Sequence, residues 1–184
     1  MSFWDAWRAS RQIRRAADRY AEESWAEPSA EDVRWLAREV AAGDEDHAAW
    51  ELRYLRRALA QLVAERDGLD DRTGAAVAAA LAERLRNDRG IARERLSIAE
   101  RQSNLRLSRY RETMRERGGG PLAGRLAAAL VQVTAPGRPR RVEEPELTAL
   151  VERELAESQE RLREIFGVAA LPEDIRPSDA VNRR

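Results

Sequence analysis

The sequence predicts an all-α protein, an elongated bundle of six or seven helices built around one long helix at about residues 88–117. Three observations support this fold class. Apolar residues make up 43% of the 184-residue chain and charged residues 36%, whereas the chain holds only 10 glycines and 7 prolines. The apolar side chains recur at intervals of three and four residues, the period of one face of a helix. No segment alternates apolar and polar residues as a half-buried strand does.

The first two helices are predicted at residues 2–25 and from Ser29 to Gly43, where the glycine ends the second helix. An apolar arc on the first helix faces away from most of its arginines. The arc consists of Phe3, Ala6, Trp7, Ala9, Ile13, Ala17, Tyr20 and Ala21. Pro28 separates the two helices, and Ser29 followed three residues later by Asp32 has the pattern of a capping box.

The next two helices are predicted from Asp44 to Gly68 and at 73–86. Asp44 is placed to cap the third helix, and Gly68 is placed to end it. Along this helix the apolar side chains follow the four-three spacing of a helix seam. The members of the seam are Ala48, Leu52, Leu55, Leu59 and Leu62. Asp70 or Asp71 would cap the Ala-rich fourth helix.

The long helix at 88–117 carries two apolar stripes, which indicates two packing neighbours and a central position in the bundle. The main stripe comprises Ala92, Leu96, Ala99, Ser103, Leu107, Tyr110 and Met114. The second stripe repeats every seven residues, at Ile91, Ile98 and Leu105, and is also suited to a helical partner. Three glycines, at 118–120, end the helix.

Two further helices complete the prediction. Apolar residues at helical spacing place a short helix at 122–133. Pro145, at a first-turn position, starts the last helix, which Gly167 ends after Phe166. Residues 168–184 are predicted to be an extended or disordered tail.

Aromatic residues are concentrated near the start of the chain, where all five tryptophans lie at or before position 50. We therefore divide the chain into aromatic-rich helices at 1–68, a Leu/Ala-rich bundle with the long helix at 69–167, and the tail. The first two segments would also suit one continuous domain.

The composition argues against most catalytic chemistry. The chain has no cysteine and a single histidine, His47, so thiolate nucleophiles, histidine triads and two-histidine zinc sites lack their residues. All 33 basic residues are arginine, which also removes lysine bases and Schiff bases, although this bias is typical of a GC-rich genome. No glycine-rich phosphate loop is found. We expect no enzyme activity, no catalytic or metal-binding residues, no cofactor and no small-molecule substrate.

Charge is segregated along the chain although the net charge is zero. Residues 84–142 carry 15 arginines and five acidic residues, a net +10, and residues 143–174 carry a net −7. Such blocks neutralise one another within a fold or recruit an oppositely charged partner. Together with the two seams they favour a non-enzymatic scaffold or adaptor that self-associates or binds a helical protein. The candidate contact residues are Trp4, Trp7, Ile91, Ile98 and Leu105.

The alternative is a helical nucleic-acid-binding accessory protein. One arc of the long helix, away from both apolar stripes, combines guanidinium groups with small polar side chains of the kind that contact phosphate. The candidate residues are Arg93, Arg101, Asn104, Arg111 and Arg115. Nearby glutamates make the same arc consistent with a solvated face or with a docking site for the acidic last helix.

The stretch TAPGRPRRVEEPE, at residues 134–146, resembles an AT-hook, a short motif that lies in the minor groove of A·T-rich DNA. Arg138 and Arg140 match the motif, and Arg141 stands beside them. Pro136 occupies the place of the leading arginine, and two glutamates follow at once. We therefore favour a stiff linker between two helices over a DNA hook.

A third interpretation is peripheral binding to a membrane surface through the first helix, which has aromatic, apolar and basic faces. Acidic residues reduce the net charge of residues 1–26 to +1, so docking of this helix onto the protein's own core is favoured. The start of the chain has no apolar signal core, and no segment offers the roughly 18 apolar residues of a membrane span. We expect a cytoplasmic protein.

Overall fold

The computed structural model describes residues 3–68, 71–116, 118–137 and 145–167, and these residues form seven α-helices and one short 3-10 helix, with no β-strand. The predicted all-α fold class is confirmed. The helices are α1 (Phe3–Ser24), α2 (Ala30–Glu39), α3 (Glu45–Asp67), α4 (Asp71–Arg86), η1 (Arg93–Arg95), α5 (Leu96–Arg115), α6 (Leu122–Thr134) and α7 (Pro145–Phe166). The predicted tail at 168–184 lies outside the described residues.

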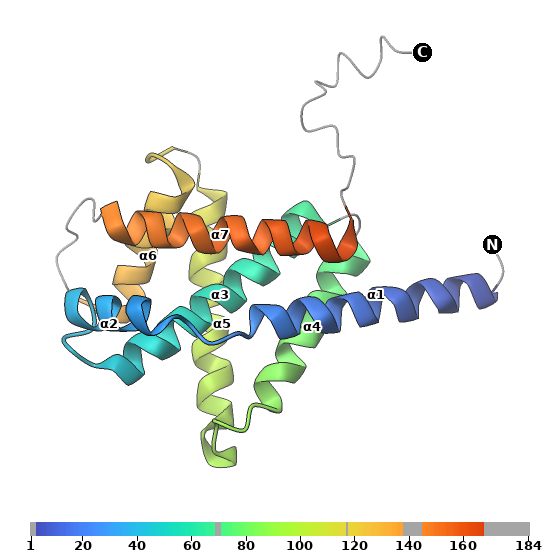
Figure 1. The fold of residues 1–184 in the computed structure, drawn as a ribbon, viewed down its shortest axis with the longest axis horizontal. Helices are drawn as coiled ribbons and strands as arrows, with labels where there is room; N and C mark the ends of the chain where they lie inside the picture. Colours follow the sequence, from blue (N-terminus) through green and yellow to red (C-terminus); the bar gives the residue numbers. More distant parts are fainter. Residues whose placement is uncertain (1–2, 69–70, 117, 138–144, 168–184) are drawn as a thin grey trace, which may run out of the picture.

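The central helix of the bundle is α3. It packs against all six other α-helices of the described part, and α7 and α5 lie on opposite sides of it (Figure 1). Apolar residues occupy several of its faces, as in the buried run Leu59–Ala64, interrupted only by Gln61. A helix that is apolar on every side must be covered on every side. The prediction that the segment 88–117 forms the central helix is therefore wrong.

The helix predicted at 88–117 is also shorter than expected. The Asp88 carboxylate accepts a hydrogen bond from the Gly90 backbone N–H at 2.8 Å, which closes a turn. Ala92 is extended (φ −60°, ψ 140°), the 3-10 turn η1 follows, and α5 begins only at Leu96. A carboxylate that binds the backbone two residues on competes with helix formation, so the helical pattern of the sequence does not extend over the turn.

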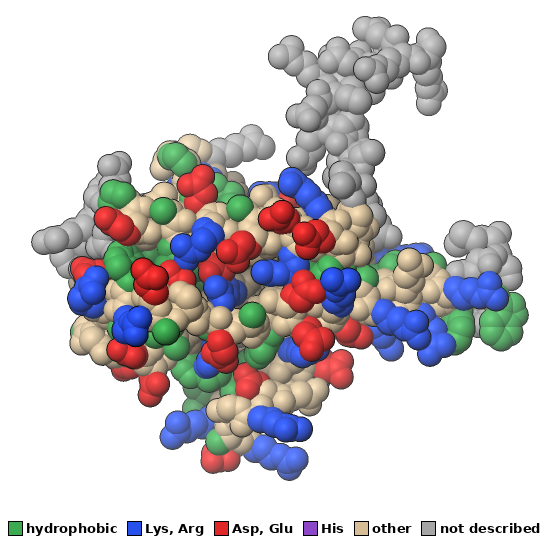
Figure 2. Space-filling model, viewed as in Figure 1, with side chains coloured by type: hydrophobic (Ala, Val, Ile, Leu, Met, Phe, Trp, Pro, Cys, Tyr) green, Lys and Arg blue, Asp and Glu red, His purple; other side chains and the backbone are tan. Residues whose placement is uncertain are grey.

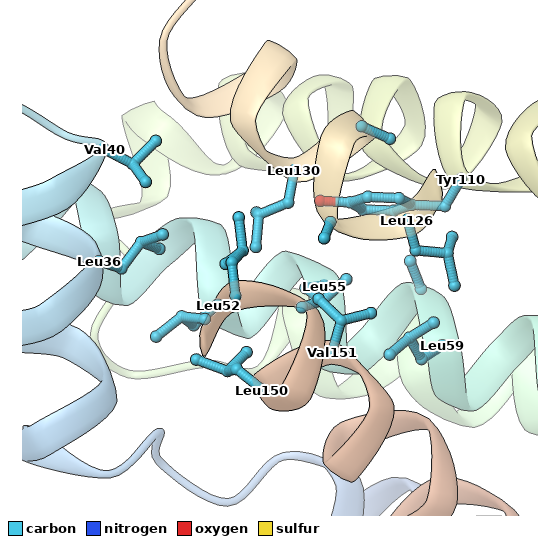
Figure 3. Close-up of a cluster of buried hydrophobic side chains, with 14 of the residues drawn as sticks. Leu36, Val40, Leu52, Leu55, Leu59, Tyr110, Leu126, Leu130, Leu150 and Val151 are labelled. Atoms are coloured by element: carbon cyan, nitrogen blue, oxygen red, sulfur yellow. The ribbon is translucent and has the colours of Figure 1, made fainter. Parts of the chain in front are cut away.

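Two clusters of buried side chains hold the helices together. The larger cluster joins α3 to α2, α5, α6 and α7. Figure 3 shows side chains from these helices converging in it, among them Leu52, Leu55, Leu130 and Val151. Full burial of a leucine stabilises the fold by about 1.5–3 kcal/mol relative to leaving it exposed. Because most of the buried leucines belong to this cluster, it supplies most of the hydrophobic stabilisation.

The smaller cluster fixes α1 against α3, α4 and α7. Ala17 and Ala21 are small enough to let the helices approach closely, and Tyr20 beside them is fully buried. The Tyr20 hydroxyl donates to the carbonyl oxygens of Ala60, at 3.2 Å, and Ser158, at 3.1 Å. Burial raises the pKa of Tyr20 far above its ordinary value, so the hydroxyl remains a donor that ties α1 to α3 and α7.

Local interactions set several helix ends. Ser29 caps α2 and Asp44 caps α3, each by accepting a hydrogen bond from the backbone N–H three residues on, at 3.0 and 2.9 Å, as predicted. Gly68 ends α3 with an extended backbone (φ −65°) rather than the left-handed one that favours glycine. A Cβ at this position would lie 2.3 Å from the Ala64 carbonyl oxygen, so a close approach of the backbone requires the glycine.

The first half of α1 extends beyond the body of the bundle (Figure 1). The described side chains from Trp4 to Arg15 are exposed except for Ile13, which is half-buried. Contact with the core begins at Ala17. We call residues 3–15 the α1 arm.

Candidate interaction surfaces

Two arginines bind buried glutamates inside the bundle and are therefore not available to a partner. Glu51 of α3 is 1% exposed and accepts a hydrogen bond from Arg106 of α5, with Nε and Oε2 3.1 Å apart. Glu154 of α7 accepts two hydrogen bonds from Arg56 of α3, at 2.7 and 2.6 Å. These pairs connect α3 to the helices on both of its sides, so part of the segregated charge is neutralised within the fold.

The outer surface of α5 carries two large apolar side chains. Ile98 is 53% exposed and Leu105 56%, and they stand two turns apart on the same face. Ile91 is half-buried and lies outside α5. It follows the turn at Asp88, and α5 begins only at Leu96. The predicted three-residue stripe on one helix is therefore wrong, and none of the described helices covers Ile98 and Leu105.

The other predicted seam, on α3, belongs to the core. Its leucines are each at most 4% exposed; they are Leu52, Leu55, Leu59 and Leu62. The regular spacing of these leucines reflects packing within the chain, because the neighbouring helices already cover them. The prediction that this seam serves self-association is wrong.

Four of the five residues of the predicted arginine arc are exposed. They are Arg93 in η1 and Arg101, Asn104 and Arg115 on α5. Arg111 is half-buried and binds Glu65 of α3, with Nη2 and Oε1 2.8 Å apart, so it is not part of the open surface. The predicted hook residues Arg138, Arg140 and Arg141 lie outside the described residues.

The outer surface of α7 is acidic. Its exposed charged side chains are Glu146, Glu152, Arg153, Glu157, Glu160, Arg163 and Glu164. Ala149 and Ala156 are exposed among them, seven residues apart, and acidic side chains gather over this helix in Figure 2. We call these nine residues the α7 stripe. Because the stripe on α7 and Arg101 and Arg115 on α5 are all exposed, the interpretation in which the acidic last helix covers the arc is wrong.

The α1 arm combines tryptophans and arginines on one face. Trp4 is 62% and Trp7 45% exposed, and their rings meet edge to face with centroids 6.0 Å apart. The Arg11 guanidinium lies over the Trp7 ring, 4.5 Å from its centroid. Of the predicted apolar arc of this helix, Ala17, Tyr20 and Ala21 are fully buried, whereas Trp7 is exposed.

Other features of the described surface offer less to a ligand. One groove of about 660 Å³ lies between α1 and α4 and is lined by Asp18, Trp25, Ala80, Glu83, Arg84, Asn87, Asp88 and Arg89. No three acidic or histidine side chains among the described residues are grouped as metal ligands. His47 Nε2 lies 2.9 Å from the Thr134 carbonyl oxygen and so links α3 to α6. None of the described helices has the length and apolar character that a bilayer-crossing segment needs.

Two features of these surfaces are not predicted from the sequence. Ala149 and Ala156 look like ordinary exposed helix residues, and only their seven-residue spacing signals the α7 stripe. The exposed face of the α1 arm includes Arg14, and the signal for this face is the helical spacing of mixed aromatic and basic residues. That spacing is seen in Trp4, Trp7, Arg8 and Arg11.

Comparison with known proteins adds no family to this description. The sequence matches no protein-family model, no curated protein and no solved structure. Functional inference therefore rests on the surfaces of this chain alone.

Proposed function

We propose that the protein is a non-enzymatic assembly protein that self-associates through the outer surface of α5. The observation that carries the proposal is the exposure of Ile98 and Leu105 on a helix whose other apolar side chains are buried or half-buried. Single exposed apolar residues are common on protein surfaces. Two such residues on one face, with Arg101 between them, have the pattern of a helix-to-helix contact.

The α7 stripe of a second copy offers a complementary surface. Along α5 the residues at i, i+3 and i+7 are Ile98, Arg101 and Leu105. Along α7 the residues at the same spacing are Ala149, Glu152 and Ala156. With a rise of 1.5 Å per residue, the apolar residues of each helix stand about 10.5 Å apart, so large side chains on α5 meet small ones on α7.

Charge supports one register of this contact. When the two helices run side by side in the same direction, with Ile98 level with Ala149, exposed side chains of opposite charge also stand level. The pairs are Arg95 with Glu146, Arg101 with Glu152, and Glu112 with Arg163. Exposed ion pairs contribute at most about 1 kcal/mol each, so they select the partner and the register more than they add affinity.

The proposed contact joins different surfaces of the two copies. A second copy bound at α5 leaves its own α5 free, so further copies add in the same way and form an open chain or a closed ring rather than a two-fold dimer.

Static light scattering over a concentration series tests the proposal. The wild-type mass should rise above the 20.9 kDa of one chain as concentration rises. Ile98→Ser combined with Leu105→Ser should return the protein to a monomer. The matched control, Trp4→Ser combined with Trp7→Ser, removes exposed apolar area elsewhere and should leave assembly unchanged. A wild-type protein that is monomeric at every concentration contradicts self-association.

The exposure of Arg101, Asn104 and Arg115 supports a second candidate, a nucleic-acid-binding accessory protein. Guanidinium and amide groups on an open helix surface suit phosphate contacts, and such binding weakens steeply as salt is added. Fluorescence anisotropy with labelled single- and double-stranded oligonucleotides at low salt measures it. Arg101→Gln with Arg115→Gln should then reduce affinity. A wild-type protein without salt-dependent binding removes this candidate.

A further inference from the structure

The α1 arm presents a second surface that the fold does not cover. No described side chain of the arm, which precedes Ala17, is buried. Figure 2 shows arginine and hydrophobic side chains gathered at the projecting end of the arm. We call its exposed aromatic and basic residues the arm face. They are Trp4, Trp7, Arg8, Arg11, Arg14 and Arg15.

Helical geometry places all six side chains on one side of α1. At about 100° per residue they fall within a sector of about 120°. Tyr20, which is fully buried, points to the opposite side of the helix. The packing of Tyr20 therefore directs most of the arm face away from the core. Arg14, at the edge of the sector, is exposed but lines a groove beside Ala76 and Ala79 of α4.

The arm face is strongly basic. Between residues 3 and 15 the sequence has four arginines and one acidic residue, Asp5. Nearer the body, Asp18 and Glu22 continue the same side of the helix, so the basic character ends where the arm meets the bundle. Most of the acidic residues that reduce the net charge of residues 1–26 to +1 therefore lie near the body and not at the arm face. The net charge of the segment alone does not reveal this separation.

We propose that the arm face docks on an anionic phospholipid surface. Guanidinium groups bind phosphate oxygens in a bidentate manner, and each basic residue near an anionic leaflet contributes about 1 kcal/mol. Tryptophan, with an apolar ring and an N–H donor, is enriched at the level of lipid headgroups. The arm face supplies both kinds of side chain on one side of a helix, as surface-bound amphipathic helices do.

The shape of the arm favours a lipid surface over nucleic acid. The arm is a single helix that extends past the bundle (Figure 1), so it presents a convex ridge of exposed side chains rather than an enclosing groove. Non-specific binders of single strands instead enclose the backbone in a basic groove, with aromatic rings stacked on successive bases. This docking does not depend on self-association through α5, because the two surfaces share no residue.

Vesicle co-sedimentation of the full chain tests the proposal. The wild type should bind phosphatidylcholine vesicles that contain phosphatidylglycerol, and should bind pure phosphatidylcholine vesicles weakly. Replacing all four arm arginines by glutamine (Arg8→Gln, Arg11→Gln, Arg14→Gln, Arg15→Gln) should weaken the binding by about 600-fold, since four contributions of about fivefold each multiply. Trp4→Ala with Trp7→Ala should weaken it by about tenfold or more and abolish the blue shift of tryptophan emission on binding.

The matched control removes four exposed arginines from other elements. Arg34→Gln, Arg38→Gln, Arg86→Gln and Arg89→Gln together should leave binding within about twofold, as expected if charge acts locally at the arm. Circular dichroism should show an unchanged fold for all variants. Equal binding to both kinds of vesicle, no binding, or equal losses in arm and control variants overturns the proposal. Arm-dependent binding of an oligonucleotide without vesicle binding overturns it too and identifies a nucleic-acid surface.

Discussion

Glu51 places a carboxylate in the interior of the bundle, where Arg106 supplies the hydrogen bonds that water would otherwise supply. Taking an ion out of water costs several kcal/mol, and a partner offsets this cost only while it is present. The pair as a whole therefore contributes little net stability. Removing one partner alone, however, leaves the other as an uncompensated buried charge and lowers the stability. The same argument applies to the buried pair of Arg56 and Glu154 on the other side of α3.

We predict that Glu51→Ala lowers the free energy of unfolding by about 3–5 kcal/mol, because it leaves the Arg106 guanidinium without its buried partner. Urea denaturation measures the loss. Replacing both residues by methionine should cost much less than either alanine substitution. If Arg106→Ala has the same effect with and without Glu51, the double-mutant cycle shows no coupling and the pair is not energetically linked.

Arg57 is a buried charge of a different kind. It is 8% exposed, its guanidinium lies over the Trp25 ring at 5.4 Å, and its Nη1 has no hydrogen-bond acceptor among the described residues. Burial lowers the pKa of Arg57 from its ordinary value to about 10. Because this pKa is lower in the folded state, the unfolded chain binds more protons than the folded chain above about pH 10, and the charge opposes folding at neutral pH.

We predict that Arg57→Met raises the free energy of unfolding at pH 7 by about 1 kcal/mol, since methionine fills the site without an ion and only a weak ring contact is lost. The advantage of the variant should shrink as pH rises through about 10, where the wild-type arginine loses its proton. Urea denaturation at pH 7 and above pH 10 compares the two. A variant that is less stable at pH 7 means that the guanidinium is satisfied in the fold.

At the scale of single helices, the features set by near neighbours in sequence are predicted correctly. Ser29 and Asp44 cap their helices because each side chain reaches a backbone N–H only three residues away. The start of α5 is mispredicted because one hydrogen bond, from Gly90 to Asp88, competes with a helical pattern that is otherwise continuous. Which members of the apolar arc of α1 are buried is not predicted, because the rotation of α1 depends on the contacts of Tyr20 with α3 and α7, which lie far away in the sequence.

The end of α3 gives a test at this scale. Gly68→Ala should lower the free energy of unfolding by about 1–3 kcal/mol, because its Cβ would meet the Ala64 carbonyl oxygen at 2.3 Å and the turn must shift. Gly124→Ala is the matched control. It lies within α6, its Cβ meets nothing within 4 Å, and it should raise stability by about 0.5–1 kcal/mol. Thermal melts of both variants check that the two substitutions change the stability in opposite directions. A Gly68→Ala variant that is more stable than the wild type contradicts the close approach of residue 68 to the Ala64 carbonyl oxygen.

At the scale of the whole molecule, the charge blocks of the sequence divide between the interior and two outer surfaces. Arg106 and Arg111 are neutralised by glutamates of α3, whereas Arg101 and Arg115 remain exposed on α5 and the glutamates of the α7 stripe remain exposed on α7. The sequence predicts the blocks but not this division, because the packing of both helices against α3 decides which side chains face outward. The result is a molecule that exposes arginines on α5 and mainly glutamates on α7.

Reversing charge on each surface separately tests the self-association proposal most directly. One variant carries Arg95→Glu and Arg101→Glu on α5, and the other carries Glu146→Arg and Glu152→Arg on α7. Each variant alone brings like charges together at the contact and should remain monomeric in sedimentation velocity. An equimolar mixture restores opposite charges at every contact and should assemble as the wild type does. A mixture that stays monomeric while the wild type assembles contradicts the α5–α7 contact.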